Sequence, residues 1–569
     1  MTAQARTTAA GRPDLDDAPT LILDLGGEFV GIAPGRRTDG PAPDEPSIGA
    51  SGGGAGLTGV ARGGVANLAG AAFAGLAGLA VTWLAARGLG PTAAGAFFAA
   101  TAAFVLITGV AKLGTPTGAV YWIARLRTAG EPALVGPCLR AALGPMSVAA
   151  TLFGVALWFA APWLAGVIHR GPPTAADAAT LRALAVFVPL AALTDTLLAA
   201  SRGYRLMRPT VMVDKMLRPG LQLAGIGGLA LLALWTAVPT ATWALAWAAP
   251  YLPAVLLAGY ALSRLIRGGR ATPRPAAGQP GRIGREFWRF TGPRAVASVL
   301  HLALQRLDVI LVAALAGPVP AAIYAVAGRF VVLGQFASQA ISNAAQPRLA
   351  ERLSIGDTAG TNLIYRITTG WVVLATWPLY LLAIGFAPYY LALFGDAYRG
   401  GVLIVVVLAA AMLLATGCGM VDMLLAMGGR TSWNLLNVAV ALVSMVALDL
   451  VLIPRHGAFG AAIGLAVAVA VNNLLPLAQV GLVLRLHPFG AGTLTAAALA
   501  TACFGVLPTL AGMAFGTGPA AAAGAVIAGS AGYAYGVRRL RRVLGLDHLL
   551  ATAGRRLRRG ATAAGPHHT

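Results

Sequence analysis

From residue 60 to residue 537 the chain consists of apolar segments, each about as long as a membrane-crossing helix. We count fourteen of them, at roughly 60–86, 93–117, 137–164, 178–200, 211–236, 241–263, 295–316, 321–345, 363–386, 401–426, 432–453, 457–484, 492–514 and 517–537. A hydrocarbon core of about 30 Å is crossed by about 20 helical residues. With 57% hydrophobic and 11% charged residues and a mean hydropathy of +0.74, the chain has far more apolar surface than a soluble domain needs. The sequence therefore predicts an all-α polytopic membrane protein with about fourteen transmembrane helices.

Basic residues in the linkers predict the orientation. Linkers after even-numbered segments carry 21 Arg or Lys residues, whereas those after odd-numbered segments carry only Arg87, Arg170, Arg399 and Arg455. Cytoplasmic loops are enriched in basic residues, so we expect both termini in the cytoplasm, with the protein in the plasma membrane of a bacterium. Membrane lipids with anionic headgroups are the expected partners of these arginines. No soluble basic domain is present to bind nucleic acid.

Two halves of the chain share a pattern at one offset of 227 residues. Three matches fall in this register: Asp195-x-Leu-Leu-Ala and Asp422-x-Leu-Leu-Ala, Gly90-Pro91 and Gly317-Pro318, and Arg125-Leu126 and Arg352-Leu353. A duplicated bundle of membrane helices is typical of transporters. Because each unit has an even number of helices, we expect two parallel six-helix repeats, followed by an extra helix pair.

This organisation divides the chain into six parts. They are a disordered cytoplasmic tail (1–57), an N-terminal six-helix lobe (58–264), a basic cytoplasmic linker (265–294), a C-terminal six-helix lobe (295–486), the extra helix pair (487–537) and a basic cytoplasmic tail (538–569). The first tail is rich in Pro, Gly and Asp and holds eight of the 20 acidic residues, a composition typical of disorder. Proline and glycine turns mark the linker.

Short motifs lie along both halves of the chain. They include Leu-Ala-Ala-Arg-Gly-Leu-Gly-Pro at 84–91, Lys112-Leu113-Gly114, Tyr324-Ala325 with Arg329, Leu393-Phe394-Gly395 with Tyr398, and Leu452-Ile453-Pro454 with Gly457. In order and spacing, over about residues 60 to 486, they resemble the oligosaccharide flippase family of the multidrug/oligosaccharidyl-lipid/polysaccharide exporter superfamily. The resemblance implies two six-helix lobes around a central cavity that moves a polyprenyl-diphosphate-linked oligosaccharide outward. It transfers no substrate identity, and the long N-terminal tail departs from the family's pattern.

Three basic residues inside predicted spans are candidates for the substrate site, because ionisable groups are costly there and usually face a cavity. Arg306 lies midway along its span, Arg329 lies in the next one, and Lys112 is about five residues from the cytoplasmic end of the second span. A guanidinium can donate two parallel hydrogen bonds to a diphosphate, so we predict that Arg306 contacts the substrate. Alternatively, Arg306 donates hydrogen bonds to the carbonyl groups at a helix end. Lys112 could extend its side chain to the membrane interface instead of facing the cavity.

Polar and acidic residues complete the predicted site. Asn67, Gln335 and Gln339 could line a sugar path, or merely form interhelical hydrogen bonds worth about 0.6 kcal/mol each. Asp308 is expected to pair with Arg329, either as a gating or coupling salt bridge or as a structural pair. Four residues near the cytoplasmic ends of two corresponding spans are expected to pair as an inner gate or to couple transport to H⁺ or Na⁺: Asp195, Arg202, Asp422 and Arg430.

No catalytic constellation, nucleotide-binding loop or paired metal-ligand motif occurs in the sequence, so we expect no enzyme activity and no cofactor. We predict a flippase that moves a polyprenyl-diphosphate-linked oligosaccharide to the outer leaflet by alternating access, for cell-surface polysaccharide biosynthesis and beside glycan-synthesis proteins. One alternative is a drug or cation antiporter of the same superfamily, with Asp308 as its central carboxylate. The other is a lipid-carrier-dependent glycan polymerase or ligase, for which the short external linkers offer no platform.

Overall fold

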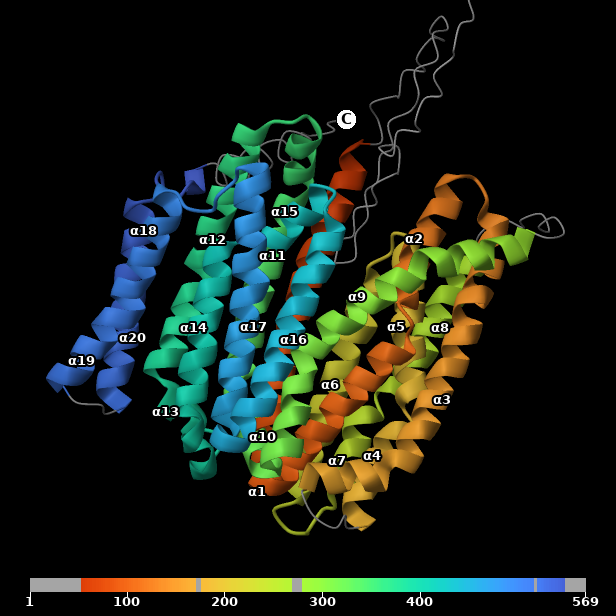
Figure 1. Ribbon diagram of the computed structural model, residues 1–569, viewed down its shortest axis with the longest axis horizontal. Helices are drawn as coiled ribbons and strands as arrows, with labels where there is room; N and C mark the ends of the chain where they lie inside the picture. Colours follow the sequence, from red (N-terminus) through yellow and green to blue (C-terminus); the bar gives the residue numbers. More distant parts are fainter. Residues whose placement is uncertain (1–52, 170–174, 269–278, 516–518, 548–569) are drawn as a thin grey trace, which may run out of the picture.

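The computed structural model describes residues 53–169, 175–268, 279–515 and 519–547, and this part of the chain is helical without a β-strand (Figure 1). Eleven helical stretches within it are long and apolar enough to cross a membrane. Most of the two predicted tails lies outside the described residues. The predicted class, an all-α polytopic membrane protein, is confirmed.

The first helix, α1 (Gly53–Ala111), contains the first predicted span and most of the second. It is interrupted at Gly90, whose backbone has φ 73° and ψ 170°. Only glycine adopts this conformation without strain, and Pro91 directly after it suits the first turn of a new helix. Figure 1 shows the two parts of α1, before and after Gly90, meeting at the lower edge of the molecule. Together with the stretch from Thr210 to Leu232 and the helix from Pro519 to Arg539, the chain makes about fourteen passes.

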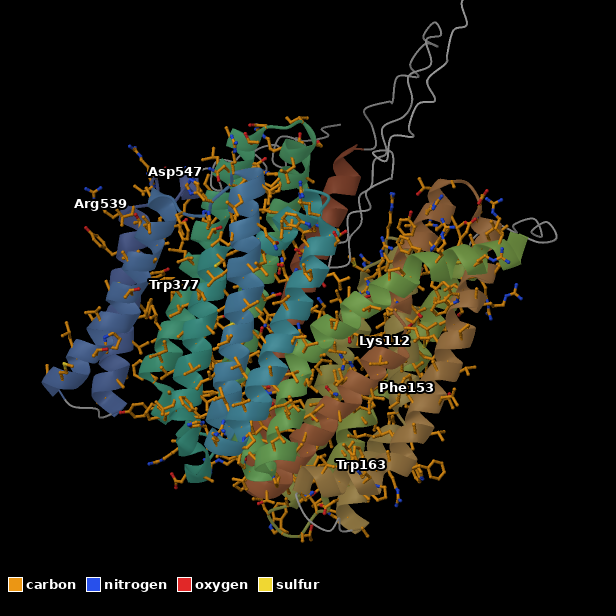
Figure 2. All side chains as sticks on the ribbon, viewed as in Figure 1. Lys112, Phe153, Trp163, Trp377, Arg539 and Asp547 are labelled. Atoms are coloured by element: carbon orange, nitrogen blue, oxygen red, sulfur yellow. The ribbon has the colours of Figure 1, made fainter. Side chains whose placement is uncertain are left out.

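The first lobe contains α1 and the helices that follow it as far as residue 268. They are α2 (Thr115–Thr128), η1 (Pro132–Leu134), α3 (Val135–His169), α4 (Ala175–Ala185), α5 (Val188–Gly203), η2 (Thr210–Leu217), α6 (Arg218–Leu232), α7 (Thr240–Ala248) and α8 (Tyr251–Gly268). Phe153 and Trp163 are exposed on the outer side of α3, as expected of side chains that contact lipid (Figure 2).

The second lobe and the extra pair follow. They comprise α9 (Gln279–Ala316), α10 (Pro318–Ala327), α11 (Arg329–Ser354), α12 (Thr358–Gly385), α13 (Ala387–Ala392), η3 (Asp396–Gly401), α14 (Val402–Cys418), α15 (Val421–Met427), α16 (Thr431–His456), α17 (Ala458–Gln479), η4 (Val480–Leu484), α18 (Ala491–Ala500), η5 (Thr501–Val506), α19 (Leu507–Phe515) and α20 (Pro519–Arg539). The largest buried cluster draws mainly on alanines of both lobes. Small residues allow membrane helices to approach closely where lipid removes the hydrophobic force between them.

Helix α9 connects the lobes and corrects the extent of the predicted linker 265–294. Its first turns pack on the first lobe through Ile283 and Phe287, and its later turns pack against α10 and α16. Arg285 and Arg289 are exposed on the opposite side of the same turns. Residues 279–294 are therefore an amphipathic helical extension. The sequence predicts a linker there because the arginines interrupt the apolar pattern. Figure 1 shows α9 running from the upper right to α10.

The lobes meet near the lower edge of the molecule. The carbonyl oxygen of Leu393, which follows α13, accepts hydrogen bonds from Trp83 Nε1 at 2.8 Å and Arg87 Nε at 3.0 Å. The Tyr398 hydroxyl donates to the Ala86 carbonyl at 3.3 Å. All three bonds join α1 to the segment between α13 and α14. This end of the molecule is therefore held closed between the lobes.

The two chain halves share one unusual backbone turn. Gly317 precedes α10 with φ 98° and ψ 177°, close to the geometry of Gly90, and Pro318 follows it as Pro91 follows Gly90. The positions differ by the predicted offset of 227 residues. This agreement supports the internal repeat, which remains a proposal for the lobes as a whole.

The approach of α1 to α10 depends on Gly95. A Cβ atom at this position would lie 1.7 Å from the Pro318 carbonyl oxygen. We expect Gly95→Ala to push the helices apart and to destabilise the protein by about 1–3 kcal/mol, as overpacking does. The thermal unfolding midpoint of the purified protein measures this. Gly78→Ala is the matched control on the same helix, because no atom lies within 4 Å of its added Cβ. Equal midpoints for the two variants would contradict the prediction.

Candidate functional site

Six ionisable residues gather inside the first lobe and are here called the N-lobe charge cluster: Lys112, Asp195, Arg202, Asp214, Lys215 and Arg218. Two ion pairs organise it. Lys112 Nζ lies 2.8 Å from Asp195 Oδ2, and Arg218 Nη2 lies 2.5 Å from Asp214 Oδ1. The cluster therefore holds four cations against two carboxylates, and both carboxylates are paired.

A break in the second predicted span positions Lys112 (labelled in Figure 2). Helix α1 ends at Ala111 and α2 begins at Thr115, with positive φ angles of 50° at Leu113 and 69° at Gly114. A Cβ atom on Gly114 would lie 2.9 Å from Ala295 of α9, so glycine serves both the turn and the helix contact. The break places Lys112 outside the regular helix, where its side chain reaches Asp195 on α5.

The other cations of the cluster have weaker partners. Lys215 Nζ donates to the amide oxygen of Asn67 at 2.6 Å. Arg218 donates to the Tyr251 hydroxyl at 3.1 Å, in addition to its pair with Asp214. Arg202 forms no hydrogen bond or ion pair in the described part of the chain, and its Nε is buried without a partner.

Neither of the expected ion pairs, Asp195 with Arg202 and Asp422 with Arg430, forms among the described residues, although Arg202 lies within electrostatic range of Asp195. Asp195 binds Lys112 instead, because the helix break delivers the ammonium group to it. The Arg430 guanidinium lies 4.8 Å from the ring centroid of Trp433, and Asp422 has no ion pair among the described residues. Arg430 precedes α16 in a non-helical conformation, so its side chain meets the first turn of α16.

Asp308 does not pair with Arg329, contrary to the prediction. Its carboxylate is buried and accepts hydrogen bonds from the Tyr324 hydroxyl at 2.6 Å and from the backbone N–H of Val309 at 2.7 Å. Tyr324 lies on α10, the helix that directly follows α9. The Asp308 carboxylate therefore accepts its hydrogen bond from α10 and not from Arg329, which lies on α11. The charged group within electrostatic range of Arg329 is instead Arg306, which repels it. Neither guanidinium has a hydrogen bond or ion pair within the described residues, and both Nε atoms are buried.

A second buried acid, Asp449 on α16, is not among the site residues that the sequence predicts. It is 0% exposed, and neither carboxylate oxygen has a hydrogen-bond partner among the described residues. Its side chain packs on Gly464 of α17, where a Cβ would lie 2.1 Å from Oδ1. It also interacts electrostatically with Asp308. The available signal was its position within a predicted span, in a chain with only 20 acidic residues.

The polar residues predicted for a sugar path separate into two groups. Gln335 and Gln339 lie four residues apart on α11 and are exposed, as is Asn343 one turn further on. Gln339 Nε2 donates to Asn343 Oδ1 at 2.9 Å. This face of α11 therefore presents a row of amides. Asn67, by contrast, belongs to the N-lobe charge cluster through Lys215.

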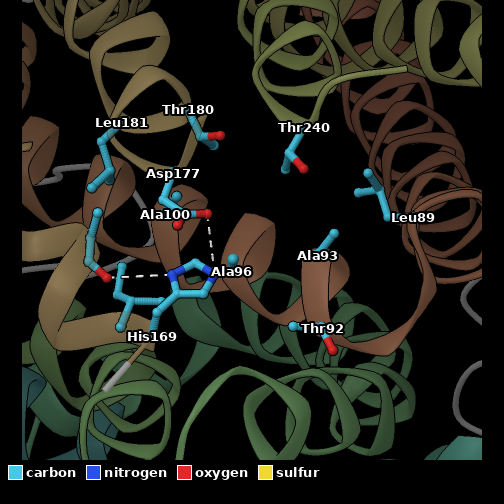
Figure 3. A pocket seen from close by; sticks show the side chains of 12 residues that line it. Leu89, Thr92, Ala93, Ala96, Ala100, His169, Asp177, Thr180, Leu181 and Thr240 are labelled. Carbon is cyan, nitrogen blue, oxygen red and sulfur yellow. Dashed lines mark hydrogen bonds and ion pairs between the residues drawn. The ribbon is translucent and has the colours of Figure 1, made fainter. Parts of the chain in front are cut away.

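Two cavities lie in the first lobe. One, of about 250 Å³, is part of the N-lobe charge cluster and is lined by Lys112, Pro116, Asp195, Leu198, Arg202, Thr210 and Asp214. The other, of about 300 Å³, lies between α1, α3, α4 and α7 and is mainly lined by apolar residues and threonines (Figure 3). There His169 Nε2 lies 3.2 Å from Asp177 Oδ1, which ties α3 to α4. No group of three potential metal ligands occurs among the described residues.

No protein-family model matches the chain, and no curated protein matches its sequence. Solved structures match its fold. "Lipid II flippase MurJ, inward closed conformation" aligns with a TM-score of 0.66 at 12% identity, over 83% of this chain and 98% of that chain. An inward-facing multidrug resistance MATE family transporter of the MOP superfamily aligns with a TM-score of 0.58 at 14% identity, over 74% and 98%. A MOP superfamily transporter from Pyrococcus furiosus aligns with a TM-score of 0.50 at 16% identity, over 75% and 95%. The chain is thus a multi-pass membrane protein with the fold of MOP superfamily transporters.

Proposed function

We propose that this protein is a flippase for a polyprenyl-diphosphate-linked oligosaccharide and works by alternating access. The observation that carries the proposal is the surplus of cations at membrane depth. The positive charges of Arg306 and Arg329 lie within electrostatic range of each other, and the single carboxylate of Asp308 can neutralise only one of them. An uncompensated arginine within the bilayer costs about 2.5 kcal/mol or more. A diphosphate offsets this cost when it binds, because each guanidinium can donate two parallel hydrogen bonds to it.

The fold alone does not choose between a flippase and an antiporter, since MurJ is described as a lipid II flippase and the MATE protein as a multidrug resistance transporter. The state of the carboxylates favours the flippase. A cationic drug needs an accessible acid, whereas Asp308 is engaged by Tyr324 and Asp449 is enclosed against Gly464. The exposed amides on α11 suit the hydroxyl groups of a glycan.

The pair Asp308 and Asp449 is our proposed coupling element. An isolated buried carboxylate is strongly disfavoured as an anion, and no described residue donates a hydrogen bond to the Asp449 carboxylate. Proton uptake and release at this pair would change the charge at the contact between α9, α10 and α16. All three helices belong to the second lobe, and α9 extends to the first. Protonation could therefore bias the relative position of the lobes.

Reconstitution of the full-length protein in vesicles tests the function. Vesicles carry a fluorescent polyprenyl-diphosphate-linked oligosaccharide in one leaflet, and a membrane-impermeant reagent reports its arrival in the other. We expect rapid transfer with the protein, and none for a polyprenyl glycoside that lacks the diphosphate. The same vesicles are tested with a fluorescent organic cation. Cation accumulation without transfer of the lipid-linked glycan would overturn the proposal in favour of the antiporter.

A further inference from the structure

We infer that the cavity in the N-lobe charge cluster is a separate phosphate-binding station, which receives the diphosphate before Arg306 and Arg329 do. This inference rests on the proposed function. The cavity measures about 250 Å³ and is lined by Lys112, Arg202 and Thr210 among others. A water molecule occupies about 30 Å³ in the liquid, so the space accommodates a phosphate group with room for solvent.

The charge balance of the cavity favours an anion. Two acids, Asp195 and Asp214, also line it, and their oxygens would repel a phosphate. Each is already neutralised, by Lys112 at 2.8 Å and by Arg218 at 2.5 Å. Arg202 forms no ion pair among the described residues, and the two acids within its electrostatic range, Asp195 and Asp214, are already paired with other cations. Lys215 donates its hydrogen bond to the neutral Asn67, and the charged groups within its electrostatic range are Asp214, which is already paired, and Arg202. The cluster therefore carries two uncompensated positive charges.

Two donors at the cavity lack partners. Thr210 lines it, is only 5% exposed, and its hydroxyl has no hydrogen bond among the described residues. Arg202 also lines it, and its Nε is likewise buried and unpartnered. A buried donor left unpaired costs about 1–3 kcal/mol, and native structures rarely keep several together without a reason. Oxyanions of the phosphate type accept from a hydroxyl and a guanidinium at once, which points to this class of ligand.

The cavity and the arginine pair belong to different levels of the bundle. Arg202 lies in the last turn of α5, and Lys112 directly follows the last turn of α1. These helix ends are on the side that the basic linkers predict to be cytoplasmic. Arg306 lies within α9, well before its end at Ala316. Arg329 is the first residue of α11, and only the short helix α10 separates it from the lower turn at Gly317. A diphosphate entering from the predicted cytoplasmic side would meet the cavity first.

Calorimetry with inorganic pyrophosphate tests the station, using the full-length protein in phosphatidylcholine nanodiscs. We expect wild-type protein to bind pyrophosphate at more than one site. The double variant Arg202→Gln/Thr210→Val should lose one site, with an affinity loss of about tenfold to a hundredfold there. Arg202→Lys should keep part of the affinity, since it keeps the charge but not the fork. The matched control is Arg208→Gln, an exposed arginine two residues before Thr210, and it should bind like wild type.

Three outcomes decide the inference. Unchanged pyrophosphate binding by the double variant, with an unchanged unfolding midpoint, overturns it even where glycan transfer is normal. Complete loss of the site in the double variant, partial loss in Arg202→Lys and wild-type binding by Arg208→Gln support it. This result supports the inference even where no lipid-linked glycan is transferred and the proposed function fails. Nanodiscs containing phosphatidylglycerol separate the sources of phosphate. If adding phosphatidylglycerol to nanodiscs with the wild-type protein abolishes pyrophosphate binding at the cavity, the station holds lipid headgroups and the inference is overturned.

Discussion

Replacing Arg306 by alanine is expected to abolish transfer of the lipid-linked glycan while membrane insertion stays normal. Arg306 has no partner of its own among the described residues apart from its electrostatic contact with Asp308. Removing one member of a charge-assisted contact costs about 2–5 kcal/mol, which corresponds to a loss of about thirtyfold or more. The rate of transfer in reconstituted vesicles measures it.

Two further variants control this experiment. Arg306→Lys should restore transport only in part, because an ammonium group cannot reproduce the two parallel hydrogen bonds of a guanidinium. Arg289→Ala changes an exposed arginine on the same helix, α9, and should transport normally. If Arg306→Ala transports at the wild-type rate, Arg306 is not part of the substrate site.

Asp449→Asn is expected to remove the response of transport to a proton gradient. The substitution keeps the shape of the side chain, which the tight contact with Gly464 requires, but removes the titratable group. A gradient of one pH unit is worth about 1.4 kcal/mol per proton, so wild-type accumulation should respond by up to about tenfold. The variant should accumulate the same amount of glycan lipid with the gradient in either direction.

The same variant has a second readout. Because Asp449 is buried and accepts no hydrogen bond from any described residue, the neutral amide should leave the unfolding midpoint unchanged or raise it. Asp396→Asn in the same lobe is the control, since Asp396 is exposed and its one ion pair among the described residues is with Arg399 at 2.9 Å. A gradient response that survives in Asp449→Asn would exclude this acid from coupling.

The lengths and polarity of the segments determined the class of this protein, because a chain with so many spans of about 20 apolar residues has to lie in a bilayer. Local chemistry also marked the turn at Gly90 and its counterpart at Gly317, since glycine followed by proline is informative without any knowledge of neighbours. Arg306 is likewise identified by its immediate sequence, because it is an arginine midway along an apolar span. Each of these features depends on a residue and on the sequence immediately around it.

The partners of the charged residues were decided only by the tertiary structure. A helical pattern does not say which neighbouring helix a face meets, and a break of three residues redirects a side chain completely. Thus Asp195 binds Lys112 rather than Arg202, and Asp308 binds Tyr324 rather than Arg329. Only the helix packing shows that Asp449 is buried with no hydrogen-bond donor among the described residues. Electrostatic energy depends on the distance between two groups and on their exposure to water, and these come from the packing of helices far apart in the sequence.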